Sequence, residues 1–138
     1  MRVVLDSSAT LAWIYSDEVS DALQQLFVLV ADSGALVPAL WRLEVANSLT
    51  AAVRRGRIDA AFRDAALRDL ALLDIAIDPQ TDDHAWASTL HLADRFRLTL
   101  YDAAYLDLAR RHSLPLASLD EELRAAAHAA GVEVLPPP

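Results

Sequence analysis

Short apolar runs alternate along this chain with longer segments of helical pattern, and this alternation restricts the folds that the chain can adopt. Five runs read as strands: residues 2–6, 35–37, 75–77, 116–119 and 132–134. The first is continuously apolar, as are strands that are buried on both faces of a parallel sheet. Strands separated by helices need crossover connections, which produce parallel sheets covered by helices. The sequence therefore predicts an α/β fold, a three-layer α/β/α sandwich with a central parallel sheet.

The segments between these runs carry helix start and stop signals. The predicted helices span residues 7–15, 19–31, 40–55, 59–73, 82–95, 100–112 and 121–130. Asp17 or Ser20 is expected to cap the second helix, and Gly34 to end it. A chain of 138 residues is long enough for one core, so we expect a single domain over residues 1–135. Residues 136–138 are all proline and are expected to form an unpaired, disordered tail.

Composition excludes several classes of protein. The chain has no cysteine, which removes disulfides and thiolate zinc sites and fits a cytoplasmic location. No signal peptide and no uncharged run of about 20 residues is present, so we expect no membrane association. The net charge of −8 argues against a whole-surface attraction to nucleic acid. All twelve basic residues are arginine, whereas P-loop proteins, response-regulator receivers and haloacid-dehalogenase-type phosphatases need a lysine.

Four carboxylates stand where a predicted strand ends or a predicted helix begins: Asp6, Glu44, Asp102 and Asp120. In a parallel sheet these places line one crevice. Two unit charges ~4 Å apart repel by about 4 kcal/mol at an effective dielectric constant of ~20, so a bound cation is the simplest reason to gather them. Carboxylate oxygens are hard ligands, which favours magnesium, with manganese as the alternative.

Each acid also has a purely structural interpretation. Asp102 and Asp120 fit helix-capping patterns, and Glu44 suits the positive end of its helix. Asp6 is harder to explain in this way, because a carboxylate at the end of a buried strand is costly unless it is paired or bound to a metal. Asp107 is expected on another face of its helix, in contact with solvent. The four histidines are expected at the surface or in packing roles, since His84 and His91 lie too far apart for one metal.

Four segments together resemble the signature segments of PIN domains. They are VVLDSS (residues 3–8), Pro38 with EVAN (residues 44–47), YDAAYL (residues 101–106) and ASLD (residues 117–120). They occur in the order and spacing of that family and cover nearly the whole chain. The short length further resembles the VapC-type toxins of bacterial toxin–antitoxin pairs. That resemblance implies a magnesium-dependent ribonuclease, a homodimer, that is held inactive by a small antitoxin and cleaves transfer RNA or ribosomal RNA.

Metal-assisted hydrolysis of a phosphodiester assigns roles to these residues. Asp6, Asp102 and Asp120 are expected to bind the metal directly or through water. Glu44 is expected to orient or deprotonate the attacking water, and it can share a second metal. Three neighbours are expected to hold the acids in place: Ser8, Asn47 and Ser118, the last at a position where the family often has threonine.

Contacts to RNA and to the antitoxin are less well defined by the sequence. Arginines cluster at residues 54–57, 95–97 and 110–111, and at least one cluster is expected to hold phosphates. Tyr101, Tyr105 and Trp13 can either stack on RNA bases or pack in the core. The helix over residues 19–31 is apolar nearly all round, so it is either deeply buried or partly covered by the antitoxin. Two other functions remain open: a non-catalytic binding scaffold of the same fold, and a metal-dependent DNA nuclease or phosphatase.

Overall fold

Parallel strands form the central sheet of this protein, in the order β3-β2-β1-β4-β5. The computed structural model describes residues 2–15 and 20–138. The strands are β1 (Val3–Leu5), β2 (Ala35–Val37), β3 (Ile75–Ile77), β4 (Leu116–Ala117) and β5 (Val134–Leu135). Val3 pairs with Ala35 and Val4 with Leu116, so β1 lies between β2 and β4 at the centre of the sheet. The predicted parallel sheet is confirmed.

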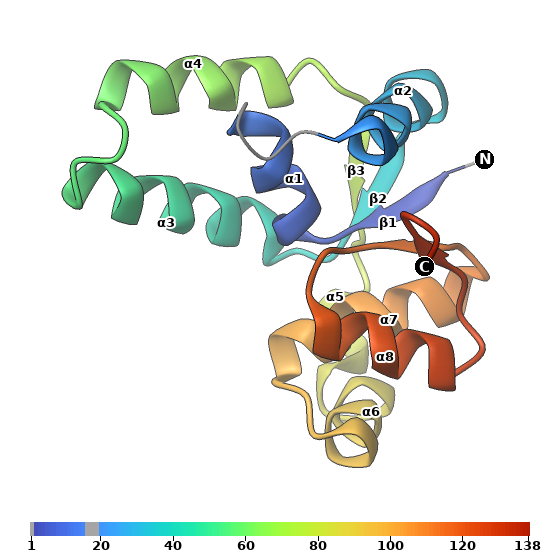
Figure 1. The fold of residues 1–138 in the computed structure, drawn as a ribbon. Helices are drawn as coiled ribbons and strands as arrows, with labels where there is room; N and C mark the ends of the chain where they lie inside the picture. The colour runs from blue at the N-terminus through green and yellow to red at the C-terminus, as the bar shows by residue number, and fades with distance from the viewer. Residues whose placement is uncertain (1, 16–19) are drawn as a thin grey trace.

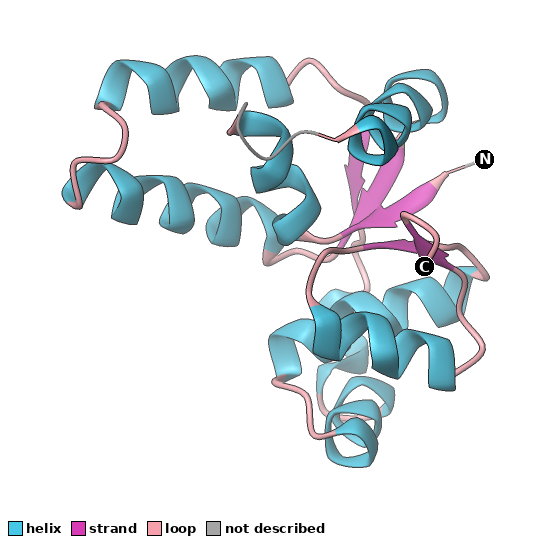
Figure 2. Ribbon diagram, in the orientation of Figure 1, coloured by secondary structure: helices cyan, strands magenta, loops and turns pink. Residues whose placement is uncertain are grey.

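Helices cover both faces of the sheet (Figure 1). They are α1 (Ser7–Ile14), α2 (Asp21–Ser33), α3 (Trp41–Arg54), α4 (Ala60–Leu70), α5 (Thr81–Ala85), α6 (Ser88–Phe96), α7 (Leu100–His112) and α8 (Glu121–Ala129). Figures 1 and 2 show α1 to α4 on one side of the sheet and α5 to α8 on the other. The chain runs outward from β1 to β3, then returns to β4 on the other side of β1. Right-handed crossovers in these two directions necessarily place their helices on opposite faces. The predicted three-layer sandwich is confirmed.

The core is built around β1 and α7. Val3, Val4 and Leu5 have no solvent exposure, and every residue of α7 from 103 to 109 is buried. Such a helix is apolar on most sides because it packs on the sheet and under α6 and α8 at once. At the other layer, Ser20 accepts a hydrogen bond from the backbone of Leu23 and caps α2 as predicted.

Gly34 ends α2 and allows a close approach of two segments. Its φ of +80° is a conformation that side chains other than glycine rarely adopt. A Cβ atom at this position would also lie 2.9 Å from the carbonyl oxygen of Asp74. Glycine here therefore lets the start of β2 lie against the segment that leads into β3.

Two details of the predicted elements are wrong. The helix expected over residues 82–95 is divided into α5 and α6 at Trp86 and Ala87. A continuous helix would place Trp86 three residues before the buried Thr89, on the face that packs in the core, whereas the break leaves Trp86 91% exposed. The last strand begins at Val134 rather than Val132, because the backbone N–H of Val132 donates to Ala127 at the end of α8.

Asp107 is buried, so the prediction that it contacts solvent is wrong. Arg111, one turn later on α7, donates to Asp107 at 2.8 Å and to Asp78 at 2.6 Å. Thr89 of α6 also donates to Asp107. Burial by itself would raise the pKa of Asp78, but the hydrogen bond and charge of Arg111 outweigh it and the pKa is lowered. Asp78 follows β3, so this ion-pair network ties α6 and α7 to the sheet.

The end of the chain is less isolated than predicted. The carbonyl oxygen of Pro136 accepts a hydrogen bond of 2.7 Å from Arg124, so this residue is not unpaired. The candidate cap Asp17 and the predicted helix start at Val19 lie outside the described residues. Within the described parts of the chain, no helix combines the length and the apolar character needed to cross a bilayer.

Candidate metal site

The four predicted acids lie at the carboxyl ends of β1 and β4 and at the starts of three helices. Asp6 directly follows β1, and Asp120 is the N-cap of α8, three residues after β4. Glu44 lies in the first turn of α3, and Asp102 in the first turn of α7. The connections leaving β1 and β4 go to opposite faces of the sheet, and ligands of open α/β sheets bind at this kind of switch point.

Asp6 is the most enclosed of the acids, with 4% of its surface exposed. Its Oδ2 accepts hydrogen bonds from Ser8 Oγ at 2.6 Å and from Ser118 Oγ at 2.8 Å. Burial nevertheless raises its pKa, and the charge of Asp120 acts in the same direction. The hydrogen bonds from the two hydroxyls thus stabilise a carboxylate that is shielded from solvent. Both of these residues were named from the sequence as supports of the acids.

Glu44 is joined to α7 by Tyr105, which the sequence did not assign to the site. The phenolic hydroxyl of Tyr105 donates to Glu44 Oε1 at 2.5 Å. The pKa of Glu44 is raised by burial first, and then by the charges of Asp6 and Asp102. The available signal was helical spacing, because Tyr105 lies one turn after Asp102 on α7 and therefore on the same side of that helix.

Asp102 is partly exposed, and its pKa is also raised. Its pKa rises from 3.8 to about 6 through burial and then through the charges of Asp6, Asp120 and Glu122. Its backbone N–H donates to Thr99 Oγ1, so Thr99 is the residue that caps α7. A hydrogen bond between the side chains of Thr99 and Asp102 acts in the opposite direction and lowers the pKa of Asp102, but burial and the neighbouring charges outweigh it.

Asp120 does act as a cap, as its structural interpretation predicted. Its Oδ1 accepts from the backbone N–H of Leu123 at 2.9 Å, and its own N–H donates to Ser118 Oγ at 3.0 Å. Its charge nevertheless acts on Asp6 and Asp102. Capping and membership of the acidic cluster therefore coexist, because a cap uses only one of the two carboxylate oxygens.

The donor set fits a hard divalent cation, although it is not a closed cage. Each of Asp6, Glu44 and Asp102 has a raised pKa that includes the charge of another of the acids, so the four carboxylates share one electrostatic environment. Among the described residues, no three His, Cys, Asp or Glu side chains are placed so that they could together hold a metal ion. Magnesium suits such a site because it keeps several waters and needs few direct protein ligands.

Asn47 is exposed on α3, and within the described part of the chain no hydrogen bond joins it to the acids. Its predicted supporting role thus stays a prediction.

Of the arginines proposed for phosphate contacts, Arg111 is occupied by its two buried partners, and Arg57 lies 4.0 Å over the ring of Tyr15. Arg97 lines a cavity together with Glu122, whose charge acts on Asp102. Of the cluster at residues 95–97, Arg97 thus lies near Glu122, whereas Arg95 lies 4.7 Å over the ring of Phe96.

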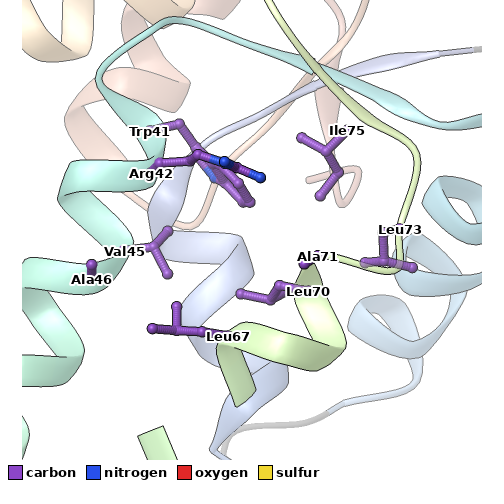
Figure 3. A pocket seen from close by; sticks show the side chains of 9 residues that line it. All are labelled: Trp41, Arg42, Val45, Ala46, Leu67, Leu70, Ala71, Leu73 and Ile75. Carbon is purple, nitrogen blue, oxygen red and sulfur yellow. The ribbon is translucent and has the colours of Figure 1, made fainter. Parts of the chain in front are cut away.

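Two apolar cavities lie on either side of α4. One, of about 270 Å³, lies between α3 and α4, where Figure 3 shows Trp41 and Arg42 opposite Leu67 and Leu70. The other, of about 350 Å³, is lined by Trp13 and Phe27 and by α4 residues such as Phe62 and Leu70.

The helix α2 buries Leu23, Leu26 and Val30, whereas its Phe27 and Val28 are exposed. The apolar helix is thus partly core and partly open surface.

A PIN-domain family model matches residues 3–129. The chain belongs to the PIN-domain family. No curated protein matches it in sequence. The fold resemblance inferred from the four sequence segments is thereby confirmed.

Solved structures share this PIN fold over nearly their whole length. PAE2754 from Pyrobaculum aerophilum has a TM-score of 0.70 at 23% identity, covering 97% of this chain and 89% of that one. FitAcB from Neisseria gonorrhoeae has a TM-score of 0.67 at 16% identity, covering 99% and 98%. VapC20 from Mycobacterium tuberculosis, described as a toxin that cleaves the sarcin–ricin loop, has a TM-score of 0.63 at 18% identity, covering 97% and 99%. At these identities the comparisons establish the PIN fold.

Proposed function

We propose that this PIN domain is a magnesium-dependent endoribonuclease that acts as the toxin of a type II toxin–antitoxin pair. The observation that carries the proposal is the acidic cluster at the switch point, where the pKa values of Asp6, Glu44 and Asp102 are all raised by burial and by the charge of at least one other acid of the cluster. A fold that only binds a partner has no need of this costly arrangement. Manganese is the alternative cation.

In this proposal Asp6, Asp102 and Asp120 hold the cation, directly or through water. The bound cation would lower the pKa of a water and offset charge on the phosphoryl group. Glu44 orients this water and accepts its proton, a role that a carboxyl with a raised pKa performs better than an ordinary one. Ser8 and Ser118 keep Asp6 in place through their hydroxyls. Asn47 is proposed to help hold the acids in place when the cation is bound.

RNA is the proposed substrate, in a structured loop of transfer RNA or ribosomal RNA. With a net charge of −8, the chain attracts phosphates only locally. The cluster of Arg95 and Arg97 is the best placed to do so, since the cavity lined by Arg97 includes Glu122 beside Asp102. VapC20 offers a precedent on the same fold, since it is described as a toxin that cleaves the sarcin–ricin loop.

Purified protein should cleave RNA with magnesium or manganese and lose this activity in chelator. Asp6→Asn and Asp102→Asn should be inactive yet folded, because they keep side-chain shape and remove charge. Asp94→Asn, an exposed change on α6, is the matched control and should be fully active. Cleavage by Asp6→Asn at the wild-type rate would reject the site. Single-stranded DNA and a generic phosphomonoester, tested in parallel, distinguish the DNA nuclease and phosphatase alternatives.

The antitoxin is proposed to cover the two cavities beside α4 and the exposed side of α2. These surfaces offer Trp13, Phe27 and Phe62 to an apolar segment, and an arginine from that segment would meet the nearby acids with favourable charge. Co-expression with the product of the adjacent gene should abolish growth arrest and yield a stable complex. Phe62→Asp should prevent this complex and leave RNA cleavage intact. Leu72→Asp, at an 85% exposed position outside both cavities, should leave both the complex and RNA cleavage intact. A neighbouring product that neither co-purifies nor protects cells would reject the toxin role.

A homodimer is proposed through the surface formed by α5, α6 and the start of α7. Trp86 is 91% exposed there, and Leu90, Leu100 and Tyr101 are exposed beside it. A cavity of about 410 Å³ includes Trp86, Leu100 and Tyr101 in its lining. Apolar patches of this kind mark association sites. Sedimentation should show wild-type dimers and Trp86→Glu monomers, with Leu72→Glu as the control that stays dimeric; a dimeric Trp86→Glu protein would place the interface elsewhere.

A further inference from the structure

Tyr105 combines a fully buried ring with a hydroxyl that reaches the acidic cluster. The residue has no solvent exposure and is the largest completely buried side chain among the described residues. Its ring therefore has one position, fixed by the packing of the core. Only its hydroxyl leaves the apolar surroundings, and it donates to Glu44 Oε1 at 2.5 Å.

Glu44 is less confined than this ring, and its hydrogen-bond partners are Tyr105 and the side chain of Ser7. It lies on the first turn of α3, it is only partly buried, and its side chain has more freely rotating bonds than an aspartate. The helices α3 and α7 lie on opposite faces of the sheet (Figure 1). The hydrogen bond from Tyr105 is therefore a direct link between an acid of one layer and the helix of the other layer that carries Asp102.

Packing does not explain the hydroxyl. A phenylalanine would fill the same space in the core, and it would leave no buried polar atom that needs a partner. The contribution of the hydroxyl therefore comes from the hydrogen bond that it donates to Glu44. Resting on the proposed function, we propose that Tyr105 is a positioning residue, which holds Glu44 at a fixed place relative to Asp102 so that the two acids act on the same cation and water.

The test compares Tyr105→Phe with Tyr15→Phe, which also removes one phenolic hydroxyl but at the far end of α1. Manganese binding by calorimetry and steady-state RNA cleavage are measured on both variants and on wild type. Partners that orient metal ligands typically contribute 10- to 100-fold to affinity or activity. We expect Tyr105→Phe to lower kcat or weaken manganese binding about 10-fold or more, with an unchanged KM for RNA. Tyr15→Phe should match wild type in every measurement.

A melting curve in chelator shows whether Tyr105→Phe is folded. We expect its melting temperature within about 3 °C of wild type, because Glu44 is open to water once the hydroxyl is gone. A Tyr105→Phe protein that fails to fold would show that the hydroxyl serves the fold, and wild-type manganese binding with wild-type kcat would show that Glu44 needs no support; either result overturns the inference. If wild type binds manganese but cleaves no RNA, the proposed ribonuclease fails, while the calorimetric comparison still decides the role of Tyr105.

Discussion

Replacing Asp102 by asparagine should make the metal-free protein more stable at neutral pH. The pKa of Asp102 in the folded protein is about 6 instead of 3.8, so the folded state retains the proton more strongly than the unfolded chain does. Ionised Asp102 therefore lowers the free energy of unfolding at pH values above this pKa. This loss of stability disappears at pH values below the pKa that Asp102 has in the unfolded chain. The asparagine side chain has nearly the same shape without the charge.

The size of this effect follows from the pKa. A pKa of about 6 instead of 3.8 corresponds to ~3 kcal/mol at full weight. Asp102 is only partly buried, so solvent screening reduces the figure, and we expect ~1–2 kcal/mol. For a chain of 138 residues this is a gain of roughly 3–6 °C in melting temperature.

The assay is a set of melting curves in chelator between about pH 4 and pH 7.5. The difference between Asp102→Asn and wild type should be near zero at the acidic end and should grow as pH rises through the pKa of Asp102. Asp94→Asn should follow wild type throughout. Magnesium should then stabilise wild type by ~1.4 kcal/mol at ten times its Kd, and the variant much less. A variant that is no more stable than wild type at pH 7.5, or a gain that does not change with pH, would refute the reasoning.

Three further outcomes are expected. Asp120→Asn should keep the cap on Leu123 and the fold, so its melting temperature in chelator should not fall, while RNA cleavage should be lost; full activity would remove this acid from the site. Arg97→Ala should raise the KM for RNA several-fold at unchanged kcat, with Arg68→Ala on α4 unaffected, and equal KM values would place the phosphate contacts elsewhere. Arg111→Met should cost about 3–5 kcal/mol in urea unfolding, because it leaves two buried carboxylates unpaired; a cost below ~1 kcal/mol would contradict the pairing described.

The sheet was predictable because its strands differ sharply in pattern from the helices between them. The acidic cluster was predictable for a related reason: carboxyl ends of parallel strands meet at one edge, whatever the details of the loops. Ser8 and Ser118 could be named because each stands two residues from an acid in the sequence, and both donate hydrogen bonds to Asp6. Tyr105 was harder to assign, since the sequence pattern of a buried helix does not show whether the hydroxyl of a tyrosine donates a hydrogen bond to a functional residue.

The contacts that were missed join residues far apart in sequence. Asp107 was expected at the surface because its spacing from Asp102 turns it away from the site. That inference on direction was sound, but the other side of α7 is also covered, here by α6 and the segment after β3. Local patterns show which way a side chain points on its own helix, whereas burial depends on what packs there. The break at Trp86 has the same origin, because local pattern did not reveal which side of the helix would be covered.

The pairing of β1 with β4 also determines when the acidic cluster can form during synthesis. Val4 pairs with Leu116, so β1 pairs with a strand that is synthesised more than a hundred residues later. Ser118 and Asp120 directly follow that strand, so they can join Asp6 only after it has been synthesised. A nascent or truncated chain that ends before β4 holds Asp6, Glu44 and Asp102 but lacks Ser118 and Asp120. On the proposed function, each molecule remains harmless until almost its entire length has been translated, which gives an antitoxin already present in the cell time to meet the finished enzyme.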